Sequence, residues 1–212
     1  KNKEETIGLN TNFRNSLFYN RGKQHHSTTY SHVLNENKNE LAIGSIRTKN
    51  QSHQLQYQHL VQKSWLINLS FMRVRTTSNI ANYTDRNFNI ESQKIESKIG
   101  YLFSKNASWS LVYEFQHKEN QIGALESFTQ NRLGTVFNFN SEKGYSINGE
   151  FSMYTNSFSG NLLSAVGFQM LEGLQPGKNQ TWRLLLQKNL TQYQDININY
   201  QGRKSETSKT IQ

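Results

Sequence analysis

The stretch WSLVYEFQ, from Trp109 to Gln116, decides the fold class because large apolar side chains occupy every second position. The odd-numbered residues are all apolar, whereas the even-numbered ones are mostly polar. Successive side chains of a β-strand point to opposite faces, so a period of two predicts a strand with one apolar and one polar face.

The same alternation recurs along the whole chain, and residues typical of turns separate the alternating segments. The other alternating segments are 7–14, 54–62, 65–71, 95–103, 133–140, 145–153, 182–187 and 196–201. Predicted turns fall at 20–23, 35–39, 63–64, 104–107, 141–144, 175–179 and 191–194, and longer loops at 76–90, 117–127 and 155–162. No segment shows a convincing helical period. The pattern predicts an all-β, antiparallel, up-and-down sheet of about ten to twelve strands.

The composition favours a thin wall over a soluble globular core. Hydrophobic residues make up 34% of the chain, whereas soluble domains contain nearly half. Disordered chains are also poor in aromatic residues, but here these reach 12%. A transmembrane β-barrel needs only one apolar face on each strand. No apolar run of about eighteen residues exists, so the sequence does not predict a transmembrane helix.

Aromatic residues toward the predicted strand ends also favour a barrel, because transmembrane barrels carry aromatic girdles at both membrane interfaces. The candidates are Trp65, Trp109, Tyr145, Trp182 and Tyr200. The predicted strands run to about 9–14 residues, longer than most strands of soluble sheets. A soluble, surface-exposed β-sandwich that acts as a binding or adhesin domain is the alternative.

Charged residues on the polar face are predicted to project into the barrel lumen, since charge is costly on the lipid side. The lumen-facing candidates are Glu96, Lys98, Glu114, Glu150 and Arg183. They could form a set that selects or guides solutes, or a lattice of salt bridges that stiffens the wall. We favour the lattice.

The sequence contains no recognisable catalytic motif, so we expect no enzyme activity, no cofactor and no metal site. His25 and His26 are adjacent and would point to opposite faces of a strand, and the absence of cysteine excludes disulfides. The formal net charge is +9, but the basic residues are dispersed, so we expect no nucleic acid partner. Outer-membrane lipids and lipopolysaccharide suit this charge better, with Arg203, Lys204 and Lys209 as candidate phosphate contacts.

The segments GLQPGKNQTW at 173–182 and NYQGRKSE at 199–206 resemble the closing hairpins of large Bacteroidetes-type outer-membrane β-barrel proteins. The resemblance covers about forty residues. It implies a barrel in the bacterial outer membrane, and it carries no catalytic or ligand-binding residues. In that group a loop like Gly202–Ser205 leads to one final strand that ends in an aromatic residue. We therefore expect 1–212 to be a single barrel domain, or a fragment of one that lacks its last strand.

Two functions fit these expectations. The chain could be a porin-like channel or transport barrel, or a structural membrane anchor for a larger assembly with other outer-membrane or periplasmic proteins.

Overall fold

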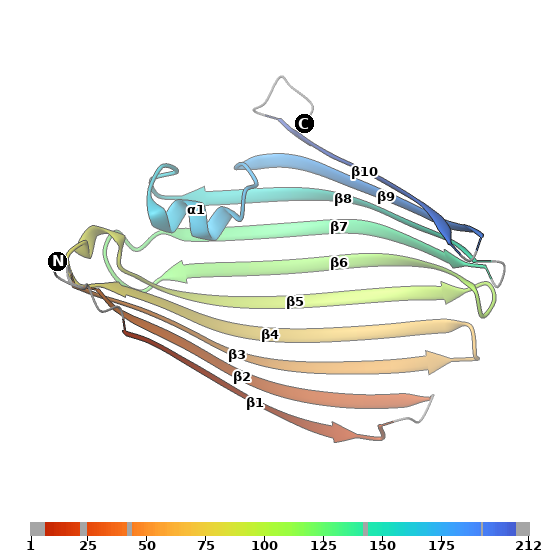
Figure 1. Ribbon diagram of the computed structural model, residues 1–212, viewed down its shortest axis with the longest axis horizontal. Coiled ribbons are helices and arrows are strands. Elements are labelled where there is room, and N and C mark those ends of the chain that lie inside the picture. Colours follow the sequence, from red (N-terminus) through yellow and green to blue (C-terminus); the bar gives the residue numbers. More distant parts are fainter. Residues whose placement is uncertain (1–6, 22–24, 42–43, 142–143, 192, 207–212) are drawn as a thin grey trace.

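A computed structural model describes residues 7–21, 25–41, 44–141, 144–191 and 193–206. The described residues form one sheet of ten antiparallel strands, in which each strand pairs with its neighbour in sequence (Figure 1). The strands are β1 (Ile7–Tyr19), β2 (His26–Leu41), β3 (Gly44–Val61), β4 (Trp65–Ile80), β5 (Phe88–Leu102), β6 (Ala107–Asn120), β7 (Ser127–Asn140), β8 (Tyr145–Ser159), β9 (Gly177–Thr191) and β10 (Gln194–Ser205). The predicted all-β, up-and-down topology is confirmed.

The two ends of the sheet differ in the length of their connections. At the end that we call the turn end, strands join through residues 20–25, 62–64, 103–106, 141–144 and 192–193. At the opposite, loop end, strands join through residues 42–43, 81–87, 121–126 and 160–176, and the last of these is the longest connection of the sheet. Helix α1 (Ala165–Leu171) belongs to the longest of these and lies against one face of the sheet (Figure 1).

The two faces of the sheet have opposite character. On β6 the even-numbered Ser110, Val112 and Glu114 are buried, each no more than 5% exposed. Leu111 and Tyr113, on the other side of the same strand, are 45% and 49% exposed. We call the side that packs against α1 the helix-facing face and the other side the outer face.

The outer face carries an apolar band that starts at the turn end. Trp65, Tyr101 and Trp109 lie side by side in register on β4, β5 and β6 and begin the band there. Trp65 and Phe71 are the first and last members on β4, six residues or about 20 Å apart along the strand. Beyond the band toward the loop end the outer face becomes polar. The main members of the apolar band on β4 to β10 are Trp65, Ile67, Leu69, Phe71, Tyr101, Ile99, Ile95, Trp109, Leu111, Tyr113, Phe115, Phe139, Phe137, Leu133, Ile147, Phe151, Met153, Leu186, Leu184, Trp182, Ile196, Ile198 and Tyr200.

Three predicted boundaries are wrong for one physical reason. Residues 76–80, 117–120 and 155–159 were expected in loops, but they continue β4, β6 and β8. There both faces of the sheet are largely polar, so the alternation disappears although the strands continue. The predicted turn at Asn35–Asn39 lies inside β2, and the loop-like Gly202–Ser205 lies inside β10, for the same reason.

Helix α1 also corrects the expectation that no segment is helical. It has only seven residues, too few for a helical period to stand out in the sequence. The side chain of Ser164 caps its first turn and accepts a hydrogen bond from the backbone nitrogen of Gly167 at 2.9 Å.

Gly202 leaves room for the indole ring of Trp182, its partner on β9. A Cβ at Gly202 would lie 2.5 Å from Cζ2 of Trp182. We expect Gly202→Ala to displace this ring, lower the free energy of unfolding by about 1 kcal/mol or more, and shift the emission of Trp182 in a Trp65→Phe/Trp109→Phe background. The matched control is Gly149→Ala, because its Cβ would meet only Leu184 Cδ1 at 4.0 Å. Equal effects of the two substitutions would contradict the prediction.

Candidate functional site

The structure places all five candidate lumen residues on the helix-facing face. Glu96 of β5 lies opposite the buried Glu114 of β6, and Glu150 of β8 lies opposite Arg183 of β9. Lys98 lies opposite Val112, which is also buried on this face. The five side chains come from β5, β6, β8 and β9, which are four of the five consecutive strands from β5 to β9.

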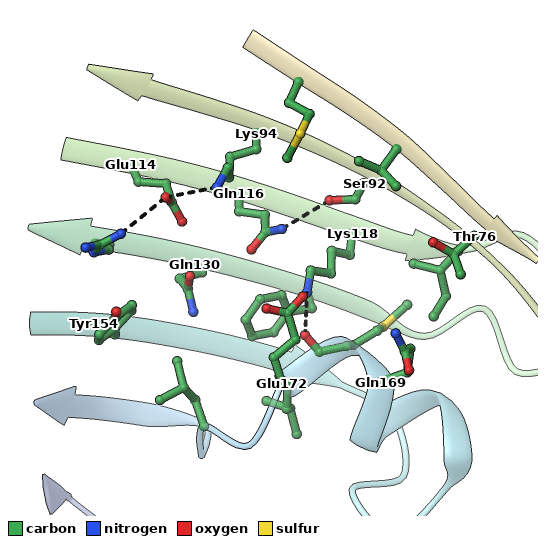
Figure 2. A pocket seen from close by; sticks show the side chains of 18 of the residues that line it. Thr76, Ser92, Lys94, Glu114, Gln116, Lys118, Gln130, Tyr154, Gln169 and Glu172 are labelled. Carbon is green, nitrogen blue, oxygen red and sulfur yellow. Dashed lines mark hydrogen bonds and ion pairs between the residues drawn. The ribbon is translucent and has the colours of Figure 1, made fainter. Parts of the chain in front are cut away.

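Glu114 and Glu150 belong to a chain of ion pairs across four strands. Oε2 of Glu114 lies 3.3 Å from Lys94 Nζ and 3.6 Å from Arg132 Nη1 (Figure 2). Arg132 Nη2 lies 2.7 Å from Glu150 Oε1, and Arg132 Nε donates to Ser152 Oγ at 3.1 Å. This geometry agrees with a stiffening lattice for these two glutamates. Within the described residues, no ion pair involves Glu96, Lys98 or Arg183.

Lys94 and Arg132, the two cations of these ion pairs, were not among the residues predicted from the sequence. Both occupy polar positions of alternating strands, which is the signal that could have found them. Their ion pairs depend on the register between strands, and the sequence of a single strand does not specify this register.

Helix α1 is fixed to the helix-facing face by an apolar cluster and one buried lysine. Val166, Met170 and Leu171 of α1 pack with Ile90 of β5 and Phe128 of β7. Lys118 of β6 is 4% exposed, and its Nζ donates to the backbone oxygen of Met170 at 2.8 Å (Figure 2). The same Nζ lies 2.5 Å from Oε1 of Glu172, just after the helix. A buried ammonium needs such partners, so Lys118 ties α1 to the sheet.

A cavity of about 580 Å³ lies between α1 and the sheet. Figure 2 shows Gln116, Gln130 and Tyr154 among the side chains that line it, together with the Lys94–Glu114–Arg132 ion pairs. Gln116 donates to Ser92, and Gln130 donates to Asn156. The lining is therefore rich in groups that can exchange hydrogen bonds with water or with a polar solute.

The aromatic candidates are split between two levels of the outer face. Trp65, Trp109 and Tyr145 lie at or near strand ends, and all three are at the turn end. Other aromatic rings lie beside them there: the ring centroids of Trp65 and Tyr101 are 4.9 Å apart, and those of Tyr145 and Phe139 are 5.5 Å apart. Trp182 and Tyr200 lie in the interior of β9 and β10, so their expected place at strand ends is wrong. The reason is that β9 and β10 extend beyond the alternating segments in which these residues were found.

The described part of the chain contains no candidate metal site and no helix suited to cross a membrane. No group of three or more His, Asp or Glu residues there could hold a metal ion. None of the helices in that part has the length and apolar character needed to cross a membrane. Arg203 and Lys204, two candidate phosphate contacts, lie on β10, while Lys209 falls outside the described residues.

The fold has counterparts among solved structures. No protein-family model matches the chain, and no curated protein matches it. CdiB from Acinetobacter baumannii is similar in structure with a TM-score of 0.50 and 11% identity, over 94% of this chain and 39% of that chain. The translocator domain of the autotransporter NalP from Neisseria meningitidis gives a TM-score of 0.42 and 8% identity, over 95% of this chain and 77% of that one. The β domain of the Bordetella autotransporter BrkA gives 0.43 and 10%, over 95% and 86%.

The class of fold follows from the sheet and from the likeness to CdiB: it is the fold of bacterial outer-membrane β-barrels. In a β-sandwich a second sheet would cover the apolar face. Here the described strands form a single sheet, and Leu111, Leu133 and Ile198 of the outer face are 45–56% exposed. The sandwich alternative does not fit this architecture.

Proposed function

We propose that the protein is a non-enzymatic β-barrel of the bacterial outer membrane that lets small polar solutes pass through a lumen narrowed by α1. The observation that carries the proposal is the polar cavity of about 580 Å³ beneath α1. It lies on the face opposite the apolar band, where a barrel would enclose water. The resemblance of the last hairpin supports an origin in the Bacteroidetes type of barrel.

Helix α1 restricts this path because it packs onto the helix-facing face near the loop end. Among the described residues, one apolar cluster and the two contacts of Lys118 hold it to the sheet. Such a contact supports a constriction of the lumen that a single substitution can loosen. The charged side chains Lys94, Glu114 and Arg132 line the same cavity and would meet a passing solute.

Replacing Lys118 by Ala tests this role of α1. Without the ammonium, the backbone oxygen of Met170 and the carboxylate of Glu172 lose their partner, so α1 leaves the sheet more often. We expect liposomes that contain the Lys118→Ala barrel to swell several-fold faster in a monosaccharide solution than liposomes with the unmodified protein.

The matched control is Lys98→Ala, which removes the same charge from the same face but makes no contact with α1 among the described residues. We expect its swelling rate to stay that of the unmodified protein. If neither the unmodified protein nor Lys118→Ala admits the solute, the passage function is wrong. The structural anchor for a larger assembly is then the better interpretation, and the ion pairs from Lys94 to Glu150 would serve rigidity alone.

A further inference from the structure

A small hollow on the outer face lies immediately beyond the apolar band. It has a volume of about 230 Å³ and is lined by Gln51, His53, Arg73, Arg75 and Glu91. These residues come from three adjacent strands, β3, β4 and β5. The hollow is on the face opposite α1 and its cavity, so the proposed passage does not use it.

The charge of the hollow is only partly balanced. Nε of Arg73 donates to Oε1 of Glu91 at 2.6 Å, and Nη2 of Arg73 contacts the same oxygen. Nη2 of Arg75 lies 3.9 Å from Oε2 of Glu91. Two guanidinium groups share one carboxylate, which leaves one positive charge when the histidine is neutral. Both arginine side chains are 54% exposed, so their remaining N–H groups are open to a ligand.

The chemistry of the lining suits a phosphate group. Guanidinium groups bind phosphate oxygens through paired N–H donors. The amide of Gln51 also lines the hollow, and its Nε2 lies 3.3 Å from Nε2 of His53 and 3.4 Å from Nε2 of His32. The side chains of Arg73 and Arg75 lie on the same face of β4, about 7 Å apart along the strand, so they can contact one phosphate from two sides.

The row of side chains next to the hollow identifies the rest of the ligand. Leu55, Phe71 and Ile95 lie one step closer to the turn end, on the same three strands, and are 44–52% exposed. Phe71 and Ile95 belong to the last row of the apolar band, and Leu55 extends this row onto β3. A free phosphate ion would gain nothing from this apolar row, whereas an acyl chain attached to the phosphate would cross it on the way into the band.

We propose that this hollow binds the phosphomonoester headgroup of a membrane amphiphile, whose acyl chain leaves the hollow across the row of Leu55, Phe71 and Ile95 toward the turn end. The inference rests on the membrane location in the proposed function but not on solute passage. It gives the lipid contact of the barrel a defined place on β3 to β5. The carboxylate of Glu91 competes with the ligand for both arginines and therefore limits its affinity.

The test measures binding of hexadecyl phosphate to the full chain in neutral maltoside micelles by native mass spectrometry. The Arg73→Gln/Arg75→Gln variant is expected to bind about tenfold more weakly or worse, because charge-assisted hydrogen bonds are lost. The control variant Lys38→Gln/Arg47→Gln removes the same charge from the outer face of β2 and β3, further toward the loop end. We expect its affinity to stay within about twofold of the unmodified protein.

A second variant changes the affinity in the opposite direction and does not depend on the stability of the arginine variant. Glu91→Gln frees both guanidinium groups and is expected to bind hexadecyl phosphate several-fold more tightly. Equal losses in the two double variants would reduce the site to general charge attraction. Inorganic phosphate that competes as well as hexadecyl phosphate would identify a free-anion site instead of a lipid site.

Liposome swelling with the same variants separates this inference from the proposed function. Liposomes that contain the outer-face variants are expected to swell as fast as liposomes with the unmodified protein. None of the substituted residues lines the cavity beneath α1. A variant that loses hexadecyl phosphate binding but gives normal swelling therefore bears on the hollow and not on the passage. An absence of swelling with every variant would contradict the passage and leave the hollow untouched.

Discussion

Leu111→Arg is expected to lower the free energy of unfolding in lipid bilayers by about 2–4 kcal/mol, because it places a charge in the middle of the apolar band. Leu111 is 45% exposed on the outer face, between Trp109 at the turn end and Phe115 at the far edge of the band. The measurement is denaturant-induced unfolding of the protein in phosphatidylcholine vesicles, followed by the gel mobility of the folded form.

The matched control is Asn138→Arg on the neighbouring strand β7. Asn138 lies opposite Ser108 on the helix-facing face, so the same guanidinium group would lie on that polar face. We expect a change of less than about 1 kcal/mol, since polar surface positions tolerate charge. Equal destabilisation by the two substitutions would mean that the outer face does not meet hydrocarbon, and the membrane orientation would be wrong.

Glu114→Ala is expected to lower the free energy of unfolding by about 3 kcal/mol, because the loss of one partner leaves the other charges without compensation. Glu114 is 5% exposed and lies between Lys94 and Arg132. Its removal brings two cations together on a half-buried face, with only Glu150 left to balance Arg132. The expected loss of unfolding free energy is at the low end of the range for buried ion pairs, because a polar cavity adjoins Glu114.

A double-mutant cycle separates the ion pair from general effects of truncation. Glu114→Ala/Arg132→Ala is expected to be less destabilised than the sum of the single variants, with a coupling of about 1–3 kcal/mol. Glu96→Ala is the control, since this glutamate lies opposite Glu114 but has no ion pair within the described residues. Additive single effects, or an equal loss from Glu96→Ala, would argue against the lattice.

The sequence alone was sufficient to assign the faces of the strands. In the segment 109–116, each large apolar residue falls on the outer face and Glu114 on the other, because neighbouring side chains of a strand alternate regardless of what the strand pairs with. The same local rule placed Glu96, Lys98, Glu150 and Arg183 on the helix-facing face. Composition identified the barrel class, because a wall between water and lipid needs few apolar residues.

The alternation of side chains does not predict where the strands end. Residues 117–120 remain in β6 although their alternation has faded, since the hydrogen bonds of the neighbouring strands hold them in the sheet. Polar side chains on both faces carry no signal that separates such a strand from a loop. For the same reason Trp182 and Tyr200 seemed to lie at strand ends, but they are central.

Only the tertiary structure decided which side chains meet. The pairing of Arg132 with both Glu114 and Glu150 follows from the registers of β6 to β8, and a shift of one residue would move these charges to the other face. The docking of α1 brings Lys118 into contact with residues more than fifty positions away in the sequence. The helix itself has only seven residues, too few for a helical period to be recognised in the sequence. The alternation that identifies a strand is local, whereas the lattice, the cavity and the outer hollow each arise from strands brought side by side.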